Sequence, residues 1–84
     1  MYSIKVKFGT AKNAALFVGV CGEYDCDVDL KYKRYSVDGK SILGVMSISP
    51  ENVCEAILHS DDRKMVEKFN EDMKLWTVEK GCFV

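Results

Sequence analysis

The sequence predicts an α+β domain in which an antiparallel sheet packs against helices on one of its faces. Some segments alternate strictly between apolar and polar residues, as strands with one wet face do, whereas others repeat at helical spacing. Their order along the chain is β-α-β-β-α-β-α, which predicts an open-faced β-sandwich of four strands with three helices on one side. The 84 residues are expected to form one domain, 1–84.

The chain opens with a strand and a helix. In the strand, the core-facing residues are expected to be Ile4, Val6 and Phe8, and the water-facing residues Ser3, Lys5 and Lys7. Gly9 ends this strand, and Thr10 is a favourable N-cap for the helix that follows. The buried stripe of that helix is predicted to be Ala14, Phe17, Val18, Cys21 and Tyr24.

Alternation returns after the first helix. The core-facing residues are expected to be Cys26, Val28, Leu30 and Tyr32, and the water-facing residues Asp27, Asp29, Lys31 and Lys33. A turn at 33–34 leads to a short strand at 35–37, and Asp38-Gly39 is a second turn. Ser41 is predicted to cap a two-turn helix over 41–46.

The last quarter of the chain predicts a strand at 54–59 and a final helix that starts at 60–62, where acidic residues suit the helix dipole. The core stripe of this helix is expected to be Val66, Phe69, Met73 and Trp76. The residues after it are taken as a tail.

Composition excludes several classes of function. A net charge of −1 lacks the basic excess of a nucleic-acid-binding face, and no apolar run is long enough to cross a membrane. The first residues lack the pattern of a signal peptide, so a cytoplasmic protein is expected. The four cysteines form no C-x-x-C pair and His59 is the only histidine, so neither a metal site nor a cofactor is expected. Buried, reduced thiols are favoured over disulfides, with only Cys82 exposed.

Three runs of residues resemble one known family. The run Gly39-Lys40-Ser41-Ile42-Leu43-Gly44-Val45-Met46-Ser47 is the most specific, and 14–18 and 24–30 support it. Together with the element order, they are similar to HPr, the small phosphocarrier of the bacterial sugar phosphotransferase system. The resemblance covers nearly the whole chain and implies an HPr-like fold and no enzymatic activity.

The phosphocarrier site of that family is altered in this chain. HPr proteins carry the phosphoryl group on a histidine at the start of the first helix, in a His-Ala-Arg-Pro-Ala motif, where the helix N-terminus and the arginine stabilise phosphohistidine. The matching residues here are Thr10, Ala11, Lys12, Asn13 and Ala14. Because a threonine hydroxyl is a poor nucleophile, the resemblance implies a former active site that no longer carries phosphate. His59, at the end of a strand, is expected to be an ordinary surface residue.

Ser41 keeps the family pattern. In HPr proteins of many Gram-positive bacteria, the matching serine is phosphorylated by a dedicated kinase/phosphorylase, and the product binds a transcription regulator of carbon catabolite repression. A catabolite-repression paralogue in this family also lacks the histidine and keeps the serine. The resemblance therefore implies a regulatory phosphoprotein, although Ser41 is equally well explained as a helix cap alone.

A second group of residues points to protein binding. Beside the core stripe of the first helix, an apolar patch is expected to form from Leu16, Val20, Ile42, Leu43 and Met46. In HPr this face docks partner proteins. Two alternatives remain: an unmodified module that self-associates through this patch as a homodimer, and thiol chemistry at Cys82.

Overall fold

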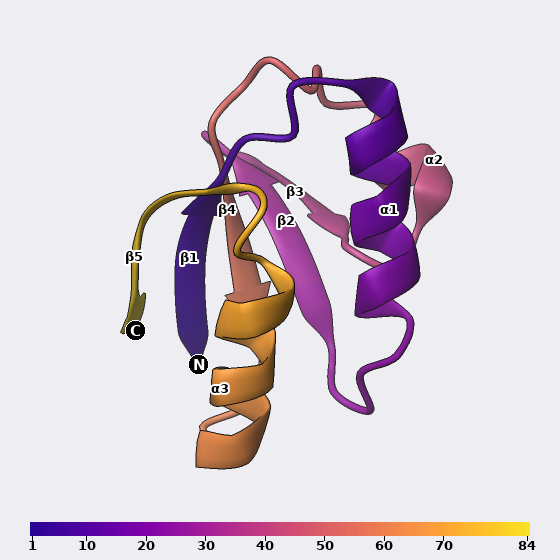
Figure 1. Cartoon of the computed structure of the whole chain (residues 1–84). Helices are drawn as coiled ribbons and strands as arrows, with labels where there is room; N and C mark the ends of the chain where they lie inside the picture. Colours follow the sequence, from indigo (N-terminus) through magenta and orange to yellow (C-terminus); the bar gives the residue numbers. More distant parts are fainter.

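The structure, a computed structural model, describes all residues 1–84, which form one β-sheet and three helices (Figure 1). The sheet has five strands in the spatial order β3-β2-β4-β1-β5, and every neighbouring pair is antiparallel. The strands are β1 (Tyr2–Val6), β2 (Val28–Tyr32), β3 (Tyr35–Asp38), β4 (Cys54–Leu58) and β5 (Thr77–Phe83).

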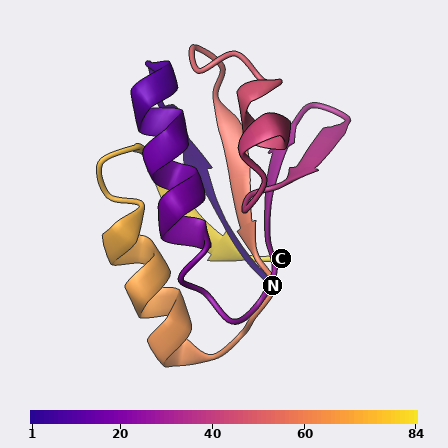
Figure 2. The ribbon, with the colours of Figure 1, turned by 90° about the vertical axis from the view of Figure 1, so that its right-hand side faces the viewer.

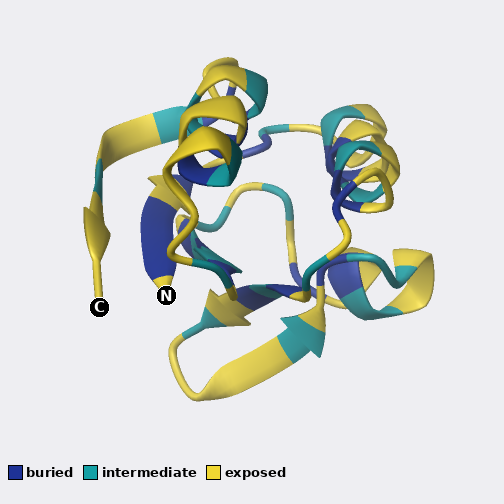
Figure 3. Ribbon diagram, turned by 90° about the horizontal axis from the view of Figure 1, so that it is seen from below, coloured by how far each residue is buried: buried dark blue, intermediate teal, exposed yellow.

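Three helices lie on the same side of this curved sheet, and the other side carries none (Figures 2 and 3). They are α1 (Ala11–Cys21), α2 (Ile42–Met46) and α3 (Arg63–Asp72). The short helix α2 packs beside α1 and against β3. None of the three helices has the length and apolar content required to span a bilayer. The predicted α+β class with an open antiparallel sheet is confirmed.

The sheet has one strand more than the sequence predicts, because the last residues of the chain form β5 along the free edge of β1. The alternation that reveals a strand is interrupted here, since β5 pairs with β1 through two register shifts. An extra residue at each irregularity moves the following side chains to the other face. A strict period of two therefore does not appear in the sequence of β5.

One hydrophobic core fills the space between the sheet and the helices, and it contains all the predicted stripe residues except Val18, which is only partly buried against it. The helices end earlier than predicted, so Tyr24, Met73 and Trp76 enter the core from beyond the ends of α1 and α3.

Several facing predictions need correction. Tyr32, the last residue of β2, is only half-buried against the core. Ser3 points away from the helices as expected, but it is buried, because Ile57 of β4 and Cys82 of β5 lie opposite it on the two neighbouring strands. Cys26 is only half-buried, because it precedes β2 and contacts Met65 at the edge of the core.

Candidate functional site

The N-terminus of α1 is closed by its own residues. Thr10 has an extended backbone, and its side-chain oxygen accepts a hydrogen bond from the backbone N–H of Asn13 at 3.1 Å, as predicted for an N-cap. The Asn13 side chain donates a second bond, 3.1 Å long, to the carbonyl of Phe8. Both bonds fix the turn between β1 and α1, and one of the N–H groups that a bound anion would need is already used.

The short connection into α1 depends on Gly9. This residue has a φ of +78°, a left-handed conformation that glycine adopts without strain. Its N–H donates to the carbonyl of Pro50 at 2.7 Å, so the 49–52 loop lies against the start of α1. Thr10 and Lys12 are both exposed beside this contact. The chain's only histidine is not at this position.

That histidine, His59, lies exposed just after β4, as expected. Its ring Nε2 is 2.7 Å from a carboxylate oxygen of Asp29 on β2, and its backbone N–H donates to the carbonyl of Asp27. His59 is thus occupied in joining the ends of two neighbouring strands. No helix begins at this residue, so the N–H groups that hold a phosphate elsewhere in proteins are not presented to it.

Ser41 begins α2, which is the predicted position. Its hydroxyl oxygen accepts the N–H of Gly44 at 3.2 Å, and its own N–H donates to the carbonyl of Asp38 at 3.0 Å. The Asp38 carboxylate accepts the N–H of Lys40, which tightens the turn before the helix. Ser41 is half-buried, so part of its surface remains open to solvent. The hydroxyl is held at the positive end of α2.

The Lys40 side chain links this turn to the end of α1. Its ammonium group donates a 2.7 Å hydrogen bond to the carbonyl of Tyr24, just beyond α1. The segment that carries Ser41 is therefore anchored to the same helix that presents Thr10 at its other end. This contact, together with the packing of α2 on α1, places the two helices side by side.

The apolar residues predicted to bind partners lie on two helices that pack together, α1 and α2, and they are called here the docking surface. Four of its members expose much of their side chains, with exposed fractions of 51% for Leu16, 46% for Ile42, 82% for Leu43 and 39% for Met46. The fifth, Val20, is half-buried and packs against the core. The exposure of large apolar groups at this density favours contact with another protein. Its use in binding stays a prediction.

One neighbour of this surface was not predicted. Tyr35, the first residue of β3, exposes about half of its surface, and its hydroxyl lies 3.0 Å from that of Ser47 at the end of α2. Alternation along β3 is too short to show which face Tyr35 takes. The amphipathic character of tyrosine was the only signal in the sequence.

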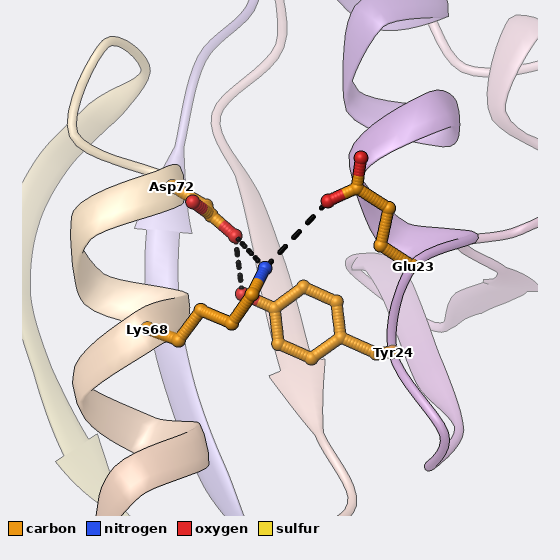
Figure 4. A network of polar contacts seen from close by, with 4 residues as sticks. All are labelled: Glu23, Tyr24, Lys68 and Asp72. Carbon is orange, nitrogen blue, oxygen red and sulfur yellow. Dashed lines mark hydrogen bonds and ion pairs between the residues drawn. The ribbon is translucent and has the colours of Figure 1, made fainter.

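A network of polar side chains ties the end of α1 to α3 (Figure 4). The Tyr24 hydroxyl donates a 2.7 Å hydrogen bond to Asp72, and Lys68 donates one of 2.8 Å to the same carboxylate oxygen. The Lys68 ammonium group also lies 3.6 Å from Glu23 and 4.5 Å from the centre of the Tyr24 ring. These contacts fix α1 relative to α3 at the end opposite to Thr10.

The network shifts the ionisation of its members. Burial opposes ionisation of Asp72, but the hydrogen bonds from Lys68 and Tyr24 outweigh it and hold the pKa of this carboxyl below its ordinary value. Burial and the hydrogen bond to Asp72 raise the pKa of Tyr24. The hydrogen bond to Asp72 raises the pKa of Lys68. Asp72 is therefore ionised, and Tyr24 protonated, across the physiological range.

The comparisons with known proteins agree with the fold described above. The family model described as "PTS HPr component phosphorylation site" matches residues 4–74. A curated relative, the phosphocarrier protein HPr of Pseudomonas aeruginosa, is 38% identical over 66 residues, which cover 77% of this chain and 73% of that protein. The chain belongs to the HPr family of the phosphotransferase system.

Two solved structures share the fold. Crh of Bacillus subtilis, described as a catabolite repression protein and as a dimer with a swapped domain, is 31% identical, with a TM-score of 0.59 and coverage of 83% of this chain and 85% of Crh. HPr-C-His from Thermoanaerobacter tengcongensis has a TM-score of 0.69 at 23% identity and covers 88% and 92% of the two chains, which supports the fold alone.

Proposed function

We propose that this protein is a regulatory adaptor of the HPr family that binds partner proteins through the docking surface and no longer carries phosphoryl groups from phosphoenolpyruvate. The observation that carries the proposal is the start of α1, where Thr10 takes the capping position and accepts the N–H of Asn13. A threonine phosphoester does not transfer its phosphoryl group readily, whereas phosphohistidine does. His59 is no substitute, since it is engaged with Asp29 at a strand end.

Ser41 is the proposed switch. A phosphate on this hydroxyl would stand at the N-terminus of α2, where the helix dipole contributes about 0.3–1 kcal/mol of stabilisation at an exposed site. It would also add a dianion next to apolar residues with large exposed surfaces, such as Leu43. The proposed partners are accordingly a kinase/phosphorylase of the HPr type and a catabolite-control transcription regulator. In this scheme Leu43 supplies buried area on binding, and Ser41 makes binding conditional.

Two phosphorylation reactions test this proposal. In the first, the protein is incubated with phosphoenolpyruvate and the first enzyme of the phosphotransferase system, with Pseudomonas HPr as the positive control. We expect no added phosphate by intact-mass measurement, and an acid-labile phosphoryl group on this chain would contradict the proposal. In the second, an HPr kinase and ATP should add one phosphate to the wild type and none to the Ser41→Ala variant.

A second candidate is self-association through the same docking surface without any modification. The exposed apolar residues of α1 and α2 favour it, and the related Crh is described as a dimer. Light scattering at increasing protein concentration separates the two functions. A dimer that dissociates in Leu43→Asp, with no effect of Ser41→Asp, would favour self-association over the phosphorylation switch.

A further inference from the structure

A groove of about 430 Å³ is lined by residues of α3, β5 and β1. None of the residues at the start of α1, around Ser41 or in the docking surface lines it. Its lining contains no acidic side chain and two lysines, and it consists of Tyr2, Ile4, Asn70, Lys74, Thr77, Lys80 and Gly81.

The groove exists because β5 is irregular. Ser3 pairs with Cys82 and Lys5 pairs with Glu79, so the two residues Lys80 and Gly81 lie opposite the single residue Ile4. Such a bulge bends a strand and turns its side chains in a new direction. Here it brings Lys80 to the same groove as α3, with Ile4 as part of the floor.

Gly81 is needed for the close approach of the neighbouring side chain. A Cβ atom at this position would collide with the phenol of Tyr2, at both its oxygen and its ring. Without that atom, the Tyr2 ring passes close to β5, and its hydroxyl donates a 2.7 Å hydrogen bond to the side-chain oxygen of Asn70 on α3. Tyr2 is buried, so this wall of the groove is fixed before any ligand arrives.

The polar side chains that line the groove supply mainly hydrogen-bond donors and cations. With its oxygen bonded to Tyr2, the Asn70 amide keeps both N–H groups without a protein partner. Lys80 forms no ion pair, and Lys74 forms only a loose one, 3.3 Å from Glu71, with both side chains well exposed. Thr77 donates its hydroxyl to the carbonyl of Met73. The groove is therefore lined by one amide and two lysines, and Glu71, which contacts Lys74, is not among the lining residues.

We propose that this groove binds a small organic anion that carries a phosphate or carboxylate group. The ammonium groups of Lys74 and Lys80 balance its charge, the Asn70 amide orients it through hydrogen bonds, and Tyr2 and Ile4 contact its carbon skeleton. The volume lies in the range of small-molecule sites. Because both lysines are exposed, binding is weak, with a dissociation constant on the order of 1 mM.

The experiment is a titration of the ¹⁵N-labelled full chain followed by amide chemical shifts. The probes are glycerol 3-phosphate, inorganic phosphate and succinate, and neutral glycerol is the negative control. We expect saturable shifts at the backbone amides of Tyr2, Thr77 and Gly81 and at the side-chain amide of Asn70. Glycerol 3-phosphate should bind more tightly than inorganic phosphate, because only the former has a carbon skeleton to contact the apolar floor.

Matched lysine variants decide whether the groove or general charge is responsible. Lys80→Met should weaken binding roughly tenfold. Lys64→Met removes an equally exposed charge from α3 outside the groove and should change binding less than about twofold. Both variants keep the fold, which circular dichroism checks. Equal losses in the two variants, shifts scattered over the surface, or no saturation would overturn the proposal, as would equal affinity for inorganic phosphate and glycerol 3-phosphate.

Discussion

Two neighbouring residues of α2 should respond in opposite ways to truncation. Val45 is 1% exposed and lies in the core, whereas Leu43 is 82% exposed in the docking surface. Val45→Ala removes two buried carbon groups at about 0.8 kcal/mol each and leaves a small cavity, so the expected loss in the free energy of unfolding is about 2 kcal/mol. For a chain of this size that loss lowers the melting temperature by about 8–16 °C. Leu43→Ala should change the free energy of unfolding by less than about 0.5 kcal/mol.

Binding should show the reverse order. Leu43→Ala should weaken capture of the phosphorylated protein's partner, because truncation of a central apolar contact costs about 1–2 kcal/mol or more. Val45→Ala should bind nearly normally at temperatures where it remains folded. Thermal unfolding followed by circular dichroism measures the first effect, and calorimetric titration with the partner measures the second. If Leu43→Ala destabilises the fold as much as Val45→Ala does, Leu43 belongs to the core and the docking surface is misplaced.

Three further predictions follow from the described contacts. Tyr24→Phe removes the hydrogen bond to Asp72 and should lower the free energy of unfolding by about 1 kcal/mol in urea denaturation, whereas an unchanged free energy would show that this bond does not stabilise the fold. The pKa of Asp72 is depressed in the folded state, so its stabilisation is complete above the ordinary aspartate pKa of about 3.9 and is lost as the pH falls through the lower folded-state value. The difference in unfolding free energy between wild type and Asp72→Asn should shrink over that acidic range, and a constant difference would disprove the assignment. Iodoacetamide at neutral pH should label exposed Cys82 but not Cys21, because burial raises the pKa of the Cys21 thiol to about 12; labelling of Cys21 in the native protein, mapped by peptide mass spectrometry, would contradict its burial.

The parts of the fold that follow local rules could be predicted from the sequence. Thr10 and Ser41 both cap helices where a short polar side chain precedes an apolar repeat, and the side-chain bonds in the structure are those that capping requires. Most of the buried residues of α1 and α3 follow from helical spacing, although Tyr24 and Trp76 are buried beyond the helix ends. The facing of β2 follows from alternation, since Val28 and Leu30 are buried and Lys31 is exposed.

The parts that depend on distant contacts could not be predicted. The strand β5 forms because the edge of β1 offers free backbone groups, and its two irregularities remove the alternation by which a strand is recognised. Ser3 is buried because strands pair with β1 on both sides, and one of them is the unpredicted β5. The bond between Tyr24 and Asp72 joins residues 48 positions apart, and no local pattern in the sequence indicates such a pair.

The same distinction applies to the candidate site. The positions of Ser41 and Leu43 on one short helix follow from sequence spacing. The packing of α2 beside α1, the two helices that carry the docking surface, depends on tertiary contacts such as the bond from Lys40 to the carbonyl of Tyr24. Tyr35 of β3 contacts Ser47 at the end of α2, and no pattern in the sequence predicts this contact.

The most direct test of the regulatory role is quantitative capture of partners after treatment with HPr kinase and ATP. The baits are wild type, Ser41→Ala, Ser41→Asp and Leu43→Ala, and the captured proteins from a host lysate are compared by mass spectrometry. We expect wild type and Ser41→Asp to capture a common partner, Ser41→Ala to capture it much less, and Leu43→Ala to lose it with or without phosphate. Equal amounts of the same partners on all four baits would contradict both the switch at Ser41 and the docking surface around Leu43.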